Sequence, residues 1–129
     1  MTDAAKQKRI LIADDEAMIR EMLAAVFKAA DFYVYEARNG EEALIISYRE
    51  HPDIIILDNR MPVKDGLMVL SELRKDNWGK DAKVIMFTGF EADDPMIEKM
   101  MEYKPAYYFV KNKVDPSQVL QKIKEILGG

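Results

Sequence analysis

The sequence predicts an α/β fold in which a five-stranded parallel sheet is covered by helices on both faces. Two observations lead to this prediction. Five short apolar runs alternate along the chain with segments whose apolar residues recur at helical spacing. The runs are continuously apolar and rich in β-branched or aromatic residues, as in strands buried on both faces of a sheet. Strands that alternate with helices pair in parallel through right-handed crossovers.

The first two strands and helices occupy the N-terminal part of the chain. The apolar run 10–13 is the first predicted strand, and the apolar residues within 18–27 follow at the spacing of an amphipathic helix. The run 32–35 is more amphipathic than the others, so we expect it at an edge of the sheet. Asn39 and Gly40 form a turn into a second, shorter helix.

The middle of the chain repeats this pattern. The runs 54–57 and 84–87 are the third and fourth predicted strands, and both are uninterrupted apolar segments. Between them, leucines recur at helical spacing after Asp65 and Gly66, so we expect the third helix to begin there.

The last three elements are a helix, a strand and a helix. Aspartate followed by proline is a favourable helix start, because aspartate caps the first turn and proline suits the first helical position. This pair occurs at Asp94-Pro95 and again at Asp115-Pro116, and the aromatic run 107–110 lies between the two predicted helices.

Composition limits the classes of function. The chain has 129 residues, of which 49% are hydrophobic and 33% charged, which suits one globular domain. The formal net charge of −4 argues against direct binding of nucleic acid, and the absence of cysteine excludes disulfides and thiolate metal sites. No apolar run is long enough to span a membrane. We therefore expect a cytoplasmic protein without membrane insertion, with residues 1–8 as a flexible tail rather than a signal peptide.

Polar residues follow four of the five predicted strands. Because functional groups gather at the carboxyl ends of parallel strands, we expect these side chains on one edge of the sheet. They are Asp14, Asp15, Asp58, Thr88 and Lys111. Three neighbouring carboxylates need a cation, and oxygen ligands favour a hard ion such as Mg²⁺ or Mn²⁺. A carboxylate can also attack phosphorus to form an acyl phosphate.

Each of these residues also has an ordinary structural interpretation. Asp14 and Asp15 could cap the first helix, and Asp58 could be a strand-end aspartate that accepts backbone hydrogen bonds. Thr88 could be a strand former, and Lys111 could be a solvated surface residue. The occurrence of all of them at strand ends favours the functional interpretation, because separate structural roles would not place them together.

Four motifs in the chain resemble those of response-regulator receiver domains of two-component systems, most of all the single-domain chemotaxis-type regulators. The motifs are ILIADDE at 10–16, LDNRMP at 57–62 with DG at 65–66, FTG at 87–89 and YFVK at 108–111. The resemblance covers residues from about Arg9 to Leu127. It implies a flavodoxin-like (βα)5 three-layer sandwich with strand order 2-1-3-4-5, the order known for this family. It also implies that residues 9–129 are a receiver domain with no output domain.

The resemblance further implies roles for the site residues. Asp58 would accept a phosphoryl group. Asp15 and Asp58 would bind Mg²⁺ through their side chains and Arg60 through its backbone carbonyl, whereas Asp14 would act mostly through a bound water. Lys111 would pair with Asp58 and then with the phosphate. The donor would be a sensor histidine kinase or a histidine phosphotransfer protein. The chain would not be an enzyme beyond self-phosphorylation from a donor and slow autodephosphorylation.

Signalling would follow from a change of surface. The resemblance implies that Thr88 follows the phosphate and that Tyr108 changes rotamer behind it, although Tyr108 also suits simple strand packing. The surface of the fourth helix, fifth strand and fifth helix would then bind a downstream protein, with the chain a monomer or a weak phosphorylation-dependent dimer. Met100 and Met101 are adjacent in the fourth helix, so we expect one of them to be exposed.

Three features depart from the family pattern. Asn112 follows Lys111 where the family usually has proline, often after a cis bond, so we expect either a trans bond with a shifted loop or a strained cis bond. Lys104-Pro105 stands where a Gly-Ala pair is usual, in a slightly longer segment. Arg60 and Phe90 lie two residues beyond Asp58 and Thr88, where side chains influence dephosphorylation. Phe90 cannot position water, so we expect slow dephosphorylation that a Phe90→Glu, Arg60→Asn double variant would speed.

Three other classes of function fit parts of this pattern less well. A flavin-binding electron carrier of the same fold needs a phosphate-binding loop after the first strand, where this chain has Asp14, Asp15 and Glu16. A hydrolase with an aspartyl-phosphate intermediate needs a substrate pocket and usually a larger cap. The remaining alternative is a protein-interaction domain that does not depend on phosphorylation, and the intact acidic residues argue against it.

Overall fold

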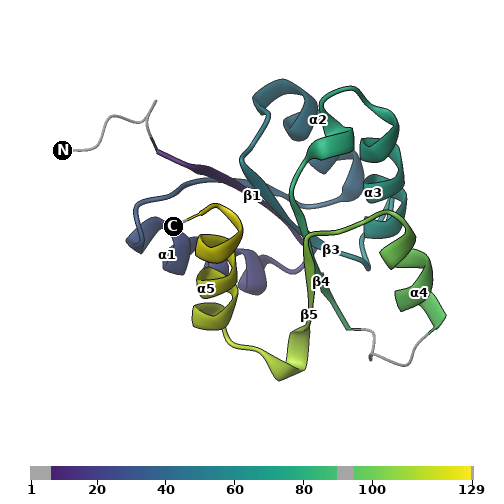
Figure 1. The fold of residues 1–129 in the computed structure, drawn as a ribbon. Helices are drawn as coiled ribbons and strands as arrows, with labels where there is room; N and C mark the ends of the chain where they lie inside the picture. The colour runs from purple at the N-terminus through teal and green to yellow at the C-terminus, as the bar shows by residue number, and fades with distance from the viewer. Residues whose placement is uncertain (1–6, 90–94, 129) are drawn as a thin grey trace.

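The computed structural model describes residues 7–89 and 95–128. Five strands and five helices alternate along the chain (Figure 1). The strands are β1 (Arg9–Ala13), β2 (Tyr33–Ala37), β3 (Ile54–Asp58), β4 (Val84–Thr88) and β5 (Tyr107–Val110). The helices are α1 (Ala17–Ala29), α2 (Gly40–Glu50), α3 (Gly66–Lys75), α4 (Pro95–Glu102) and α5 (Pro116–Ile126), with short 3-10 turns at Gly79–Asp81 and Lys111–Lys113. Among the described residues, no helix has the length and apolar character needed to cross a membrane.

The five strands form one parallel sheet in the order β2-β1-β3-β4-β5. This confirms the predicted α/β fold and strand order. The amphipathic second strand lies at an edge, as its pattern predicted, whereas the fully buried β3 and β4 lie inside the sheet. The carboxyl ends of all five strands point the same way, so the residues that follow them meet at one edge.

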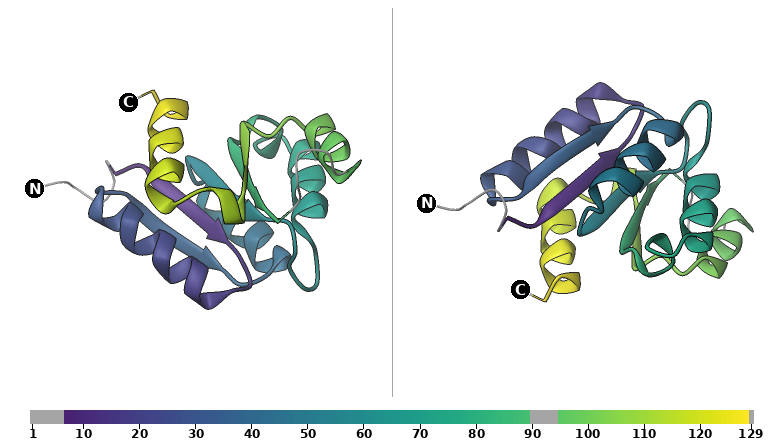
Figure 2. Two further views of the ribbon diagram at one scale, coloured as in Figure 1. Left: turned by 90° about the horizontal axis from the view of Figure 1, so that it is seen from below. Right: turned by 90° about the horizontal axis from the view of Figure 1, so that it is seen from above.

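Helices cover both faces of the sheet, with α1 and α5 on one side and α2, α3 and α4 on the other (Figures 1 and 2). Successive strand residues face opposite sides, so each strand contributes to two cores. In β1, Leu11 packs with α2, α3 and α4, while its neighbours Ile10 and Ile12 pack with α1 and α5. This arrangement explains why the inner strands β1, β3 and β4 are apolar at nearly every position.

Side-chain caps fix the beginnings of three helices at the predicted places. The side chains of Asn39, Asp65 and Asp115 accept hydrogen bonds from backbone N–H groups in the first turns of α2, α3 and α5. Pro95 is the first residue of α4, and the predicted capping residue Asp94 lies outside the described residues.

The N-cap of helix α1 is Glu16, whose side chain makes no capping bond, so neither Asp14 nor Asp15 has the capping role that was the structural alternative for them. The helix differs from its prediction in one respect, because its buried face is narrower than the apolar stripe in the sequence. Leu23 and Phe27 are buried, but Met18 and Met22 are exposed. The buried residues of α1 all lie after Met22, so the first half of the helix contributes less to the core.

The connection from α4 to the site is held by Arg74 of α3. Its guanidinium donates hydrogen bonds to the carbonyl oxygens of Tyr103 and Lys104 after α4, and to those of Gly79 and Ala82 before β4, at 2.7–3.0 Å. Lys104, in the place where the family usually has glycine, has a φ of 53°. Two of the four bonds hold this turn against the end of α3, and the other two hold the segment before β4.

The peptide bond between Lys111 and Asn112 is trans, since the described part of the chain contains no cis peptide. Of the two conformations expected there, the structure has the unstrained one. Lys111 begins a 3-10 turn directly after β5, so the lysine side chain starts from the carboxyl edge of the sheet.

Two aromatic residues stack at the opposite end of the sheet. The rings of His51 and Trp78 lie 4.5 Å apart between centroids and are inclined by 9°. His51 ends α2, and Trp78 lies between α3 and β4, so the stack joins the two connections that enter β3 and β4. Trp78 therefore has a packing role that its position in a polar segment did not reveal.

Candidate functional site

The candidate site lies at the carboxyl edge of the sheet, where four neighbouring strands end. Asp14 follows β1, Asp58 ends β3, Thr88 ends β4 and Lys111 follows β5. Asp14, Asp58 and Thr88 are almost fully buried. Parallel register places Asp58 opposite Phe87, so Thr88 extends one residue beyond it on the adjacent strand. The fold thus brings together residues that are up to 97 positions apart in the sequence.

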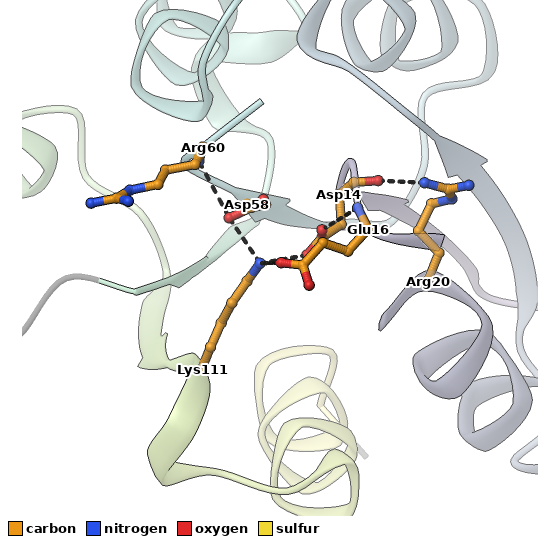
Figure 3. Close-up of polar contacts among 6 residues, drawn as sticks. All are labelled: Asp14, Glu16, Arg20, Asp58, Arg60 and Lys111. Atoms are coloured by element: carbon orange, nitrogen blue, oxygen red, sulfur yellow. Dashed lines mark hydrogen bonds and ion pairs between the residues drawn. The ribbon is translucent and has the colours of Figure 1, made fainter. Parts of the chain in front are cut away.

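Lys111 is the centre of the site's charge network (Figure 3). Its Nζ atom lies 2.8 Å from Oδ2 of Asp14, 3.1 Å from Oδ1 of Asp58 and 3.5 Å from Oε1 of Glu16. An ammonium group has three N–H donors, so these three carboxylates can occupy all of them. Lys111 is therefore a paired, largely buried cation rather than a solvated surface lysine.

Among the described residues, Oδ2 of Asp58 has neither a hydrogen bond nor an ion pair, whereas Oδ2 of Asp14 has its ion pair with Lys111. Oδ1 of Asp58 accepts from the backbone N–H of Arg60 at 3.3 Å and pairs with Lys111, but Oδ2 is buried and accepts no hydrogen bond among the described residues. A buried, unsatisfied oxygen is costly unless another group binds it. A cation could supply the partner that this atom lacks.

The donor set fits a hard divalent cation. Carboxylate oxygens of Asp14, Asp15 and Glu16 lie within 4.8 Å of one another, and Asp58 is joined to the same group through Lys111. Within the described residues, all ligand atoms gathered here are oxygens, which Mg²⁺ and Mn²⁺ prefer. Asp14, Asp15 and Glu16, with Asp58 beside them, therefore offer the kind of ligand that such an ion needs.

Burial and repulsion change the proton affinity of Asp58. Burial raises its pKa most, the charge of Asp14 raises it further, and the contacts with Lys111 and the N–H of Arg60 oppose the rise, with a resulting pKa of about 7. A cation bound at Oδ2 would favour the ionised form. Near neutral pH, Asp58 can thus exist with or without its proton.

Lys111 keeps its charge in spite of burial. Burial lowers the pKa of Lys111, but the hydrogen bonds and charges of Asp14 and Asp58 outweigh that effect and raise the pKa above its usual value. The ammonium therefore remains available to neutralise negative charge beside Asp58.

The loop after β3 contains a strained turn. The backbone N–H of Lys64 donates to the carbonyl of Pro62 at 2.8 Å, and Val63 between them has a φ of 69°. Positive φ is unfavourable for a β-branched residue. The side chain of Arg60, which lies in the same loop, extends away from Asp58, so its backbone and not its guanidinium faces the site (Figure 3).

The remaining predicted residues lie around this centre. Tyr108 is half-buried in β5, pairs in register with Met86 and packs against the core beside α4. It also lines a surface groove, so its position is compatible with either packing or a switch role. Phe90, predicted to tune dephosphorylation, lies outside the described residues.

Two contacts at the site were not predicted. Glu16 approaches Lys111, although its place after two aspartates was the only signal in the sequence. Arg20 of α1 donates to the backbone carbonyl of Asp14 at 2.7 Å and pairs with Glu36 of β2 at 3.5 Å (Figure 3). Arg20 thus ties the turn after β1 to its helix and to the edge strand, and no sequence motif distinguishes it.

Comparisons with known proteins agree with this geometry. A family model described as the response regulator receiver domain matches residues 10–124. The chain is 36% identical to a probable transcriptional regulator ycf27 of Porphyridium aerugineum, over 95% of this chain and 49% of that protein. It is 31% identical to the phosphate regulon transcriptional regulatory protein PhoB of Pseudomonas aeruginosa, over 93% of this chain and 52% of that protein. The chain therefore spans about half the length of these two curated relatives.

Solved structures show the same fold. A putative response regulator from Chloroflexus aurantiacus J-10-fl matches with a TM-score of 0.85 and 30% identity, over 96% of this chain and all of that chain. A CheY-like response regulator receiver domain protein from Methanospirillum hungatei JF-1 matches with a TM-score of 0.85 and 27% identity, over 95% of each chain.

Proposed function

Because the chain belongs to the family of response-regulator receiver domains, we propose that Asp58 accepts a phosphoryl group from a histidine kinase or a histidine phosphotransfer protein, with Mg²⁺ or Mn²⁺ as cofactor. The observation that carries this proposal is the state of the Asp58 carboxylate. One oxygen is held by Lys111 and the N–H of Arg60, while the other has no hydrogen-bond partner.

Oδ2 of Asp58 is the proposed nucleophile. It would form a bond to phosphorus as the phosphorus–nitrogen bond of the donor phosphohistidine breaks, and the electron pair of that bond would stay on the imidazole nitrogen. The hydrogen bonds to Oδ1 fix the orientation of the carboxylate, which favours an in-line approach to the phosphorus. A hollow of about 620 Å³ lined by Asp15, Arg60 and Pro62, among others, gives the donor access beside the site.

Positive charge would stabilise the transferring group. Asp14, Asp15, Asp58 and the carbonyl of Arg60 would hold the metal ion, which supplies neutralisation of the phosphoryl oxygens. Lys111 already lies 3.1 Å from Asp58, so its ammonium could move from the carboxylate to a phosphoryl oxygen over a short distance. Thr88 lies one residue beyond the register partner of Asp58, so its hydroxyl could donate a hydrogen bond to a second phosphoryl oxygen.

The proposed response is a changed surface of α4, β5 and α5. A groove of about 440 Å³ on this face is lined by Met101, Tyr107 and Tyr108 together with residues at the start of α5. Met100 is buried and Met101 is 46% exposed, so one of the two methionines faces outward. Movement of Thr88 and Tyr108 toward the phosphoryl group would alter this groove and its affinity for a downstream protein.

The first test is intact mass after incubation with Mg²⁺ and acetyl phosphate, for the wild type and Asp58→Asn. The proposal expects one phosphoryl adduct on the wild type, absent without Mg²⁺ and absent in the variant. No adduct, with a phosphoramidate donor and candidate kinases as well, would favour the phosphorylation-independent interaction domain instead.

The output surface needs a separate test with a partner captured by the phosphorylated form. Met101→Lys should weaken binding of that partner, whereas Met18→Lys, at an exposed methionine of α1, should not. Equal binding by both variants would contradict the proposed surface. This proposal treats residues 9–129 as the receiver domain, acting in the cytoplasm as a monomer or a weak phosphorylation-dependent dimer.

A further inference from the structure

Asn59 is a buried polar residue next to the proposed phosphoacceptor, and its side chain bonds to backbone rather than to the charged groups of the site. It is 5% exposed. Its side-chain Oδ1 instead accepts a hydrogen bond from the backbone N–H of Leu67, eight residues later, at 3.0 Å. A buried amide that bonds to backbone so far along the chain fixes the relative position of two segments.

The first N–H groups of α3 are satisfied mainly by Asn59. The N–H of Gly66 donates to the Asn59 carbonyl at 2.8 Å, that of Leu67 to the Asn59 side chain at 3.0 Å, and that of Met68 to the Asp65 side chain at 2.8 Å. These groups have no acceptors within the helix itself. Asn59 therefore supplies the acceptors for two of the first three N–H groups of α3.

The two ends of the loop are consequently locked together. A Cβ atom on Gly66 would lie 2.3 Å from the carbonyl oxygen of Asp58 and 2.8 Å from the Cα of Asn59, so only glycine permits this approach. The loop between them contains Arg60, whose N–H holds the Asp58 carboxylate, and the strained turn at Val63. A strained loop keeps its shape only if its ends are fixed.

We infer that Asn59 is a positioning residue, which sets the backbone of Asp58 and Arg60 so that the carboxylate and the Arg60 carbonyl can bind Mg²⁺ together. This inference rests on the proposed function. Asn59 itself would not be a ligand of the ion. Loss of the Asn59 side-chain acceptor would release the N–H of Leu67 and loosen the loop. The carboxylate of Asp58 and the carbonyl of Arg60 would then no longer be held at a fixed distance from each other.

A matched control separates this role from helix capping. Oδ1 of Asn39 accepts from the N–H of Glu42 at 2.8 Å, so Asn39→Ala removes the same kind of bond from the start of α2, which carries no site residue. Asn59→Ala and Asn39→Ala should both lower the free energy of unfolding. Only Asn59→Ala should weaken Mg²⁺ binding, by about tenfold or more, as loss of an outer partner of a metal ligand commonly does.

The measurement is the dissociation constant of Mg²⁺ by titration calorimetry on the full chain, with urea unfolding of each variant without metal. Equal Mg²⁺ affinity of Asn59→Ala and Asn39→Ala would overturn the inference and leave the proposed function intact. A wild type that binds no Mg²⁺ would overturn both. Asn59→Asp is a second variant in case Asn59→Ala does not fold, because aspartate keeps the shape of the side chain and the oxygen that accepts from Leu67. Its affinity should be no weaker than that of the wild type, and a weaker one would also overturn the inference.

Discussion

Lys111 and Asp58 form an ion pair of 3.1 Å in which the lysine side chain is 18% exposed and the aspartate side chain 3%. They come from β3 and from the turn after β5, so the pair connects segments that only the folded sheet brings together. Removing one partner of such a pair leaves a buried charge without compensation, which costs more than the pair itself contributes.

Lys111→Met should therefore destabilise the protein at pH 8 without Mg²⁺. We expect a loss of about 2–4 kcal/mol in the free energy of unfolding, because Asp14 and Asp58 would then repel each other in a buried place. Mg²⁺ should restore part of this loss, since it replaces the missing positive charge. Urea unfolding with and without Mg²⁺ measures both effects. Lys122→Met, which removes an exposed ion pair with Glu125, is the control and should change the stability much less.

The raised pKa of Asp58 predicts a pH-dependent stability. Without metal, the folded chain keeps the proton up to about pH 7, whereas the carboxyl of the unfolded chain releases it near its model value of 3.8. Between these values the folded state binds more protons, so the contribution of Asp58 to stability falls as pH rises, by at most about 1.4 kcal/mol per pH unit.

Asp58→Asn removes this contribution. Its stability relative to the wild type should increase from pH 4 to pH 7 and then remain constant, as measured by urea unfolding in metal-free buffer. A difference between the two proteins that does not change with pH would mean that Asp58 has an ordinary pKa in the folded state.

Arg74 should be important for stability although it is far from the site. Its guanidinium donates to four backbone carbonyls, and Arg74→Ala would leave several of them without a partner. We expect a loss of about 3 kcal/mol in the free energy of unfolding. Arg74→Lys should be destabilised almost as much, because an ammonium lacks the planar set of N–H donors with which the guanidinium reaches several carbonyls. Arg49→Ala, at an exposed arginine, should have little effect, and a similar loss in both alanine variants would contradict the prediction.

Val63→Gly should stabilise the protein. Val63 has a φ of 69° and is 68% exposed, so glycine would relieve backbone strain and remove little packing. The extra conformational entropy of glycine in the unfolded chain opposes this effect. The net gain in the free energy of unfolding should be up to about 1 kcal/mol, measured by thermal or urea unfolding. Val63→Ala keeps the strain and is the control. A loss of stability in Val63→Gly would show that this conformation is not strained.

The sequence predicted the sheet well because its strands are buried. Uninterrupted apolar runs predicted the bounds of β1, β3 and β4 to within one residue, and the side chains expected to meet at one edge of the sheet, Asp14, Asp58 and Lys111, do lie together. Prediction was weakest for β2, expected at 32–35 and found at Tyr33–Ala37, because a half-exposed edge strand has a mixed pattern.

Contacts that depend on the tertiary fold could not be predicted. The position of Glu16 beside Lys111, the bonds of Arg74 to four carbonyls and the link from Asn59 to Leu67 all join segments whose proximity is set by the packing of the layers. No local pattern encodes these distances. The positive φ of Val63 is equally invisible, because valine ordinarily avoids it.

The stack of His51 on Trp78 gives the molecule a natural optical probe. Trp78 is the single tryptophan of the chain and His51 the single histidine. The strands that separate the stack from Asp58 are five residues long, about 16 Å. Tryptophan fluorescence should therefore follow unfolding and the loss of the stack, while remaining almost silent to events at the carboxyl edge of the sheet.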